Sequence, residues 1–327
     1  MFDIIIKKIG FSYGKDEVLS INNLSINKGS TTVFLGSNGS GKTTILKLIS
    51  GIYSPSKGSI SPGTETLKNK SVLVHQNPYL FSGSVKYNIE FGLKIRNISK
   101  NIRKSIIQKV LLEARLLNLI TRKTSSLSGG EKHRLAIARA LSLNPDILVL
   151  DEPFANIDPE SRDTIEKLIL KREKNGITTI ISTHNLTSAY RLASSIIYMD
   201  KGKIIEPETN FIKGSVIKRD DYFCFFQADN YKKVSPILIP ATDGDYSTAV
   251  IPYKDIFLSG TNIKTSAQNQ YIGIIRSLVK KGNQFFVTID CGISLKAIVT
   301  DLSVREFKIK EGKSIFVNFK ASAVKLY

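Results

Sequence analysis

A glycine-rich loop between a buried strand and an apolar helix limits the possible folds of this chain more than any other feature. The run Thr-Thr-Val-Phe-Leu at 31–35 predicts the strand, and the apolar residues within 44–51 predict the helix. Spacing and context fit G-x-x-x-x-G-K-[ST], in which backbone N–H groups and a helix N-terminus surround phosphate oxygens. The sequence therefore predicts a phosphate-binding loop made of Gly36, Ser37, Asn38, Gly39, Ser40, Gly41, Lys42, Thr43 and Thr44.

The lysine and the first threonine of this loop have specific predicted roles. The ammonium group of Lys42 should reach the β- and γ-phosphates of a nucleotide, and the hydroxyl of Thr43 should coordinate Mg²⁺. A glycine turn that merely joins strand to helix is the alternative, but it leaves the Lys-Thr pair in register unexplained. We therefore expect the chain to bind a nucleotide with Mg²⁺.

Two acids end a second buried strand. The run Ile-Leu-Val-Leu at 147–150 leads directly into Asp151 and Glu152. Carboxylates beside a buried strand are costly unless they face a cation, whereas a strand end exposed to solvent would need no function. Next to a phosphate loop the first reading is favoured: Asp151 completes the Mg²⁺ sphere, mainly through water, and Glu152 polarises the attacking water as a general base.

A third motif places glycines at another helix N-terminus. Ser128 and Glu131 have the S-x-x-E spacing of a capping box, with Gly129 and Gly130 between them and an amphipathic run after them. Such a helix start can hold phosphate, although a capped helix without any ligand has the same pattern.

Alternating strands and helices surround these motifs. The first 30 residues alternate like paired strands, and 86–134 looks helical and basic, with seven lysines and five arginines against three glutamates. Helices about 159–174 and 186–193 then alternate with strands at 177–182 and 196–199, which predicts a mostly parallel sheet covered by helices. The basic stretch is either a solvated face or a surface for anionic lipid head groups.

Composition narrows the remaining classes. The chain has 327 residues, enough for two domains, and a net charge of +19, which invites anionic partners. Its two cysteines lie far apart, so neither a disulfide framework nor a zinc site of the usual spacing is expected, and His75 and His133 are interpreted as structural or surface residues. The sequence begins without a signal-peptide pattern and has no apolar run long enough to span a membrane, so any membrane role is expected to come through a partner.

In their order along the chain, the phosphate loop, the Ser128–Glu131 motif and the Asp151-Glu152 pair resemble the motifs of ABC-type ATPases, and the resemblance covers residues 1–205. It implies that the nucleotide is ATP. The resemblance implies that Tyr13 stacks on adenine, Gln76 lies in the Q-loop with a role in metal binding and catalysis, and His184 contacts the γ-phosphate. It also implies a D-loop at Asn156-Ile157-Asp158 and a homodimer, in which Ser128, Gly129, Gly130 and Asp158 of one subunit face the nucleotide of the other. Core packing of Tyr13 and a merely polar loop at Gln76 remain alternatives. His133, where Gln is common, and Asn185, where Asp is common, are mild departures that remove no phosphate or metal contact.

The C-terminal residues carry a second resemblance. The segments PYKDIFLS at 252–259, TSAQN at 265–269, VTDLS at 299–303 and FKASAV at 319–324 are similar to the oxyanion-binding barrel of molybdate and tungstate systems. In place of the arginine usual in that family the chain has Gln268, which lacks a permanent charge and bidentate donors. A purely structural barrel is therefore an alternative to an oxyanion site formed by Ser266, Gln268, Thr300, Ser303, Lys320 and Ser322.

Together these observations predict an α/β P-loop NTPase domain of the ABC ATPase type with a helical subdomain, followed by a small OB-like β-barrel. The expected boundaries are 1–213 for the ATPase domain, 214–250 for a connecting region and 251–327 for the barrel. The resemblance implies the ATP-hydrolysing subunit of a tungstate or molybdate importer at the cytoplasmic face of the membrane. Its expected partners are a second copy, a membrane permease and an extracytoplasmic binding protein.

Two alternatives differ in cargo or in class. An importer of sulfate, iron, polyamine or sugar would have the same motifs. A soluble ABC ATPase acting on nucleic acid would suit the charge, but the interval from Lys42 to Ser128 has no room for a long coiled-coil insert and the chain has one cassette. Nor do Phe285, Phe286, Phe316 and Phe319, which we interpret as core, form an obvious row of exposed stacking residues, so no nucleic acid is expected.

Overall fold

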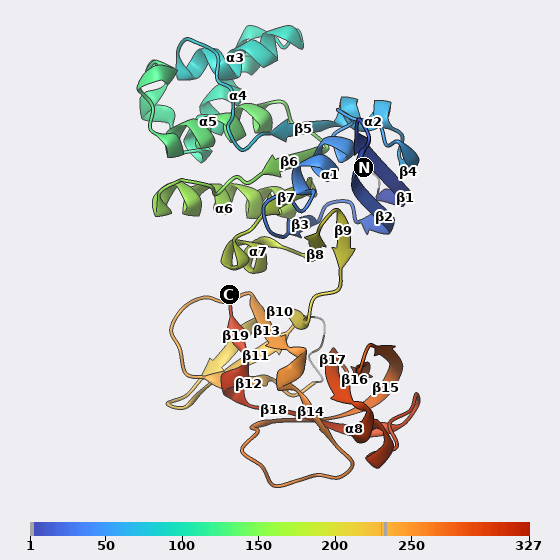
Figure 1. Cartoon of the computed structure of the whole chain (residues 1–327). Coiled ribbons are helices and arrows are strands. Elements are labelled where there is room, and N and C mark those ends of the chain that lie inside the picture. The colour runs from blue at the N-terminus through green and yellow to red at the C-terminus, as the bar shows by residue number, and fades with distance from the viewer. Residues whose placement is uncertain (1–2, 230, 232–233) are drawn as a thin grey trace. The chain divides into compact units, whose positions relative to one another are not determined.

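The computed structural model describes residues 3–229, 231 and 234–327, and the chain divides into two compact units between Ile205 and Glu206 (Figure 1). The first unit contains a six-stranded sheet that is parallel except for its last strand. Across the sheet, the strands are β5 (Ser71–Val74), β6 (Ile147–Asp151), β7 (Thr178–Thr183), β3 (Thr31–Leu35), β8 (Ser195–Asp200) and β9 (Lys203–Ile205).

The register of this sheet brings three motifs to one edge. Asp151 at the end of β6 pairs with Ser182 of β7, and Thr183 of β7 pairs with Leu35 of β3. Because these strands are parallel, the residues that follow them emerge side by side. The phosphate loop, the acidic pair and His184 therefore meet at the carboxyl edge of the sheet.

The same unit contains a smaller antiparallel sheet built from strands near its N-terminus. Its order is β2 (Asp16–Ile26), β1 (Ile4–Tyr13) and β4 (Lys57–Ser61). Alternate residues such as Ile4 and Ile6 are fully buried, and with Phe34 of β3 and Ile45 they belong to one apolar core. The strand pair predicted for the first 30 residues is confirmed.

Seven α-helices complete the described part of the first unit. They are α1 (Lys42–Ile49), α2 (Thr64–Lys70), α3 (Val85–Ile95), α4 (Lys100–Glu113), α5 (Gly129–Ser142), α6 (Pro159–Lys174) and α7 (Leu186–Leu192), with short 3-10 turns at Leu117–Leu119 and Thr124–Ser126. In Figure 1, α3, α4 and α5 form a group beyond β5, and α5 packs against both of the others. The helical character predicted for 86–134 is confirmed.

The second unit consists of two antiparallel five-stranded sheets around one apolar core. The first has the order β12 (Ile237–Pro240), β11 (Phe223–Ala228), β10 (Thr209–Arg219), β13 (Thr248–Pro252) and β19 (Lys325–Leu326). The second has the order β14 (Phe257–Ser259), β18 (Ser314–Phe319), β15 (Asn269–Lys281), β16 (Gln284–Asp290) and β17 (Ser294–Thr300). Helix α8 (Asp301–Glu306) follows β17, and 3-10 turns lie at Tyr253–Asp255 and Ala321–Ala323. The predicted α/β class with a β-rich C-terminal domain is confirmed.

The expected connecting region, residues 214–250, lies within this second unit. Strand β10 runs through the expected boundary at 213/214 without a break, and β11, β12 and part of β13 also fall in 214–250. Alternate side chains of β10 and β11, including Ile212, Cys224 and Phe226, enter the shared core, so these strands are part of the fold. The chain changes unit near Pro207. Phe319 is fully buried, while Phe285, Phe286 and Phe316 are partly buried.

Candidate functional site

The phosphate loop has the backbone geometry that its glycines allow. Gly41 has φ of 96°, in the left-handed region, and it directly precedes the first residue of α1. The hydroxyl oxygen of Ser40 is buried without a hydrogen-bond partner. A turn of this kind followed by a helix N-terminus leaves backbone donors available for an anion.

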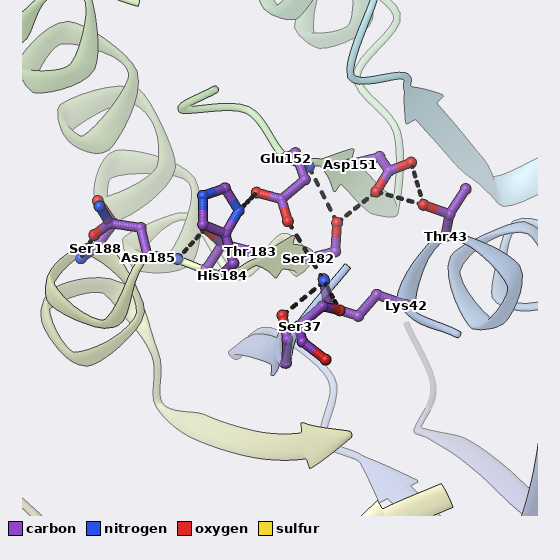
Figure 2. A network of polar contacts seen from close by, with 11 residues as sticks. Ser37, Lys42, Thr43, Asp151, Glu152, Ser182, Thr183, His184, Asn185 and Ser188 are labelled. Carbon is purple, nitrogen blue, oxygen red and sulfur yellow. Dashed lines mark hydrogen bonds and ion pairs between the residues drawn. The ribbon is translucent and has the colours of Figure 1, made fainter. Parts of the chain in front are cut away.

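Lys42 closes the loop from inside. Its ammonium group donates to the carbonyl oxygens of Gly36 at 2.8 Å and Ser37 at 3.0 Å, and it lies 3.6 Å from Oε1 of Glu152 (Figure 2). The side chain is only 6% exposed. A buried ammonium with two carbonyl partners and one carboxylate is a positive charge held within the loop.

Thr43 and Asp151 form a compact set of oxygen atoms. The hydroxyl of Thr43 donates to the Asp151 carboxylate, with distances of 2.9 and 3.1 Å to its two oxygens. The hydroxyl of Ser182 donates to Oδ1 of Asp151 at 2.5 Å. Hydroxyl and carboxylate oxygens are ligands that Mg²⁺ prefers. The described residues contain no group of three His, Cys, Asp or Glu side chains that could hold a metal ion.

Glu152 is held in an unusual conformation. Its φ of 46° lies in the left-handed region, which costs a residue with a side chain about 1–3 kcal/mol, and its N–H donates to the backbone carbonyl and the hydroxyl of Ser182. Oε2 lies 3.0 Å from Nδ1 of His184. Oε1 is buried and accepts no hydrogen bond, and the Lys42 ammonium lies 3.6 Å from it.

Lys42, Thr43 and Glu152 of this set line a pocket of about 330 Å³. Its lining joins the phosphate loop to Glu152 and to Gln76, which follows β5. The backbone donors of the loop, the buried ammonium of Lys42 and the hydroxyl of Thr43 fit a nucleotide triphosphate with its Mg²⁺. The pocket is lined by Val18, Asn38, Gly39, Gly41, Lys42, Thr43, Thr44, Gln76 and Glu152.

Tyr13 lies at the end of β1 in a cluster of three rings. Its ring centroid is 5.0 Å from that of Phe11 and 6.0 Å from that of Tyr53, both edge-on. The side chain is nevertheless 45% exposed. Part of the ring is therefore free for stacking.

The second glycine motif begins α5 with the expected capping box. Ser128 accepts the N–H of Glu131 at 3.2 Å, and the Glu131 carboxylate accepts the N–H of Ser128 at 2.7 Å. A Cβ on Gly130 would lie 2.2 Å from the Ser161 hydroxyl and 2.4 Å from Asp158 Oδ2, so only glycine fits. Hydrogen bonds from the backbone and hydroxyl of Ser161 hold the pKa of Asp158 below its usual range. The starts of α5 and α6 thus lie side by side.

Two residues in or near the site were not predicted from the sequence. The Ser182 hydroxyl donates to the Asp151 carboxylate and accepts the backbone N–H of Glu152, and Val18 of β2 lines the pocket. A polar residue near the end of the buried strand beside Asp151 was a usable signal for Ser182, because parallel neighbours bring such side chains together. Val18 looked like any other strand residue.

The six candidate oxyanion residues fall into two hydrogen-bonded places in the second unit. Thr300 caps α8, where its hydroxyl accepts the N–H of Ser303 at 3.3 Å and lies 3.0 Å from the Ser303 hydroxyl. Gln268 Oε1 accepts the N–H of Ala321 at 3.0 Å, which ties the loop of Ser266 to the turn next to Lys320 and Ser322. Ser266, Gln268, Thr300, Lys320 and Ser322 are exposed.

No helix of the described residues combines the length and apolar character needed to cross a membrane.

Comparisons with known proteins agree with this geometry. A family model for ABC transporters matches residues 19–155. The molybdate/tungstate import ATP-binding protein of Pyrococcus abyssi (strain GE5 / Orsay) is 33% identical over 327 residues, which cover 90% of this chain and 92% of that protein. The tungstate uptake system ATP-binding protein of Peptoclostridium acidaminophilum is 36% identical over 64% of this chain and 99% of its own.

A solved structure extends the likeness to the fold. A dimeric ATP-binding cassette in a post-hydrolysis state, bound to ADP and Pi, is 27% identical with a TM-score of 0.56, and the match covers 62% of this chain and 97% of that one. The long match to the Pyrococcus protein includes both units of this chain, whereas the structural match is the size of one cassette. The chain therefore belongs to the ABC transporter family of ATP-binding proteins and is an ATP-hydrolysing enzyme.

Proposed function

We propose that the chain supplies the ATP hydrolysis that drives uptake of tungstate or molybdate through a membrane permease. The observation that carries this proposal is the 33% identity over both units to a molybdate/tungstate import ATP-binding protein. In the same proposal the chain lies peripherally at the cytoplasmic face of the membrane. An extracytoplasmic binding protein delivers the oxyanion to the permease.

The proposed nucleotide contacts follow the pocket lining. Lys42 and the loop amides bind the phosphates, Tyr13 stacks on adenine, and Thr43, Asp151 and Gln76 hold the metal. Mg²⁺ bound there would neutralise charge on the phosphate oxygens. The buried ammonium of Lys42 and the 2.9 Å contact between Thr43 and Asp151 support this assignment.

The proposed chemistry centres on Glu152. Its carboxylate accepts a proton from water as the water oxygen bonds to the γ-phosphorus and the bond to the bridging oxygen breaks. His184, 3.0 Å from Oε2, orients that carboxylate and contacts the γ-phosphate. Oε1 of this carboxylate accepts no hydrogen bond, which supports the role of base.

A second copy of the chain completes each site in this proposal. Ser128, Gly129, Gly130 and Asp158 of one subunit would face the nucleotide of the other. The capped, glycine-lined start of α5 offers N–H donors for phosphate, and a dimeric cassette is among the structural relatives.

The permease has a suitable docking place between β5 and the helices α3 and α5. A mainly apolar groove of about 330 Å³ lies there, and its lining includes Pro78, Tyr79, Phe91, Ile95 and Leu143. Tyr79 is 75% and Ile95 66% exposed, so an apolar partner seated in the groove would remove their surface from water. Two lining residues of the groove, Pro78 and Tyr79, lie in the loop that contains Gln76. We propose that an apolar helix of the permease occupies the groove.

Ile95→Glu tests this groove. A carboxylate there should oppose burial of an apolar helix, so ATP hydrolysis by the isolated chain should persist while association with the permease and ATP-driven uptake fall at least about tenfold. The matched control is Ile102→Glu on α4, which is 56% exposed and lies outside the groove lining. Equal uptake in both variants would refute the docking site.

The proposed cargo is tested by uptake in cells that produce the chain with its permease and binding protein. Cellular tungsten, molybdenum, sulfur and iron are measured by mass spectrometry, with a catalytically inactive chain as reference. We expect accumulation of tungsten or molybdenum that depends on the active chain. Accumulation of another cargo instead would support the alternative importer, and no transport combined with salt-dependent nucleic-acid binding would support the other class.

The same assay addresses the second unit. We propose that its exposed donors, including Lys320, bind oxyanion weakly and report cytoplasmic supply, since Gln268 offers a neutral amide where a guanidinium would supply a permanent charge and two donors. Cells preloaded with tungstate should then import more slowly, and Lys320→Ala should remove the slowing. Equal inhibition in both chains, or none, would leave this unit a structural barrel.

A further inference from the structure

His133 links two motifs that the proposed function places at different nucleotide sites. It lies in the second turn of α5, and its Nε2 is 2.8 Å from the backbone carbonyl oxygen of Gln76, 57 residues away in sequence. Its Nδ1 is 3.1 Å from the carbonyl oxygen of Gly129, in the first turn of the same helix. A carbonyl oxygen only accepts, so each contact needs an N–H on the ring: one neutral tautomer donates from Nε2 to Gln76, the other donates from Nδ1 to Gly129, and the protonated ring donates to both. One imidazole ring therefore touches both the Gln76 loop and the start of α5.

The loop on one side of this contact has little structure of its own. Residues 75–84 form neither helix nor strand, and His75, Gln76 and Asn77 are exposed. Besides the His133 contact, Arg139 donates to the carbonyl oxygen of Tyr79 at 2.8 Å, the Asn88 amide hydrogen-bonds the N–H and carbonyl of Phe81, and Thr124 donates to the carbonyl oxygens of Phe81 and Gly83. Among these contacts, the one from His133 is made at Gln76 itself, the residue of this loop that lines the nucleotide pocket with Lys42. Loss of the His133 contact would therefore act directly on Gln76.

The other side of the contact is the glycine start of α5. The Ser128–Glu131 capping box holds this start within its own helix, but it does not fix the helix relative to the nucleotide pocket. Gly129 and Gly130 have no side chains to do so. The ring of His133 supplies a direct polar connection between this helix start and a pocket residue.

We propose that His133 is a positioning residue through which nucleotide bound at one site of the dimer sets the position of the signature helix that closes the other site. The inference rests on the proposed dimer and on the proposed contact of Gln76 with the nucleotide and its metal. It predicts that the His133 contact contributes to cooperativity between the two sites, because a shared element whose position both sites bias couples their occupancy.

The test compares variants of similar size in the full-length chain. His133→Leu removes both ring nitrogens, whereas His133→Gln keeps an amide that can donate to the Gln76 carbonyl. ATP hydrolysis is measured against ATP concentration, and ADP affinity of the dilute chain is measured by calorimetry. With two sites, the Hill coefficient of the parent should lie between 1 and about 2.

We expect His133→Leu to lower the Hill coefficient to about 1 and the maximal rate roughly 5-fold or more, with ADP affinity unchanged within about twofold. His133→Gln should recover most of the cooperativity. A merely structural role would not separate these quantities. If His133→Leu unfolds at a lower temperature than the parent, His133→Met serves as a second variant without a donor.

The possible failures are distinct. A parent chain that hydrolyses ATP without cooperativity would contradict the proposed two-site dimer. A cooperative parent whose Leu and Met variants keep its Hill coefficient would overturn the role of His133 alone. A parallel loss of ADP affinity and rate, with cooperativity retained, would also overturn it, since the residue would then only support the pocket.

Discussion

Glu152→Gln should reduce ATP hydrolysis at least about 100-fold while ATP binding persists. Glutamine has almost the same shape as glutamate, but its amide cannot take the proton from water, and general-base catalysis is worth about 10²–10⁴ in rate. The contacts that hold the phosphates come from Lys42 and the loop amides, which this change leaves in place. We therefore expect the variant to accumulate with ATP bound. In the proposed dimer, ATP that is not hydrolysed should keep the two copies together.

Three measurements check this result. Steady-state phosphate release gives the rate, filter binding of labelled ATP gives occupancy, and size-exclusion chromatography with ATP·Mg²⁺ gives the association state. Glu160→Gln is the control, because Glu160 is an exposed acid whose ion pair with Arg115 is worth little. Hydrolysis by Glu152→Gln at the parental rate would show that another group is the base. The surface control should behave like the parent in all three measurements.

The site was predictable from sequence where its chemistry is local. The phosphate loop, the acids after β6 and the capping box of α5 each occupy a short segment, because strand ends and helix starts fix their geometry. Parallel pairing then brings the segments together, which the alternation of strands and helices indicates in advance. The contact between Thr43 and Asp151, 108 residues apart, is the clearest result of that topology.

Contacts that depend on packing left a weaker signal. Ser182 bonds Asp151 and Glu152 only because β6 and β7 are neighbours in a particular register. His133 was interpreted as a structural or surface residue, and its contact with Gln76 depends on how α5 packs against β5. Single polar residues carry no period or spacing, so only the assembled fold identifies their partners.

The domain limits were hard to place for a similar reason. The expected limit at 213/214 falls inside β10, whereas the chain changes unit at 205/206. Residues 214–250 contain Asp220 and Asp221 after β10 and Asp243, Gly244 and Asp245 between β12 and β13, a composition that resembles a linker. Their buried positions alternate with exposed ones, as expected for strands whose inner face enters a core. Such short strands are recognised only when the second sheet that covers them is known.

Lys42→Ala should weaken nucleotide binding roughly 10- to 150-fold, the range that corresponds to about 1.5–3 kcal/mol for a hydrogen bond to a charged group. The ammonium now bridges two loop carbonyls beside Glu152, so it is a buried charge already held where phosphate would bind. Alanine removes the charge and leaves the Glu152 carboxylate without its cation. The variant loses the attraction between Lys42 and phosphate and also the hydrogen bonds from Lys42 to the loop carbonyls. Its affinity for nucleotide therefore falls, and the rate of hydrolysis falls with it.

Thermal unfolding with and without ATP·Mg²⁺ measures this effect directly. A ligand that binds only the folded chain raises the free energy of unfolding by an amount that grows with the ratio of its concentration to Kd, so the parent should melt at a higher temperature with nucleotide. Lys42→Ala should show little shift at the same concentration. Lys42→Arg is the matched control for charge: its planar guanidinium keeps the positive charge but cannot replace a compact ammonium between two carbonyls, so an intermediate shift is expected. A full parental shift in Lys42→Ala would mean that the loop amides bind the phosphates without this lysine, and would remove it from the site.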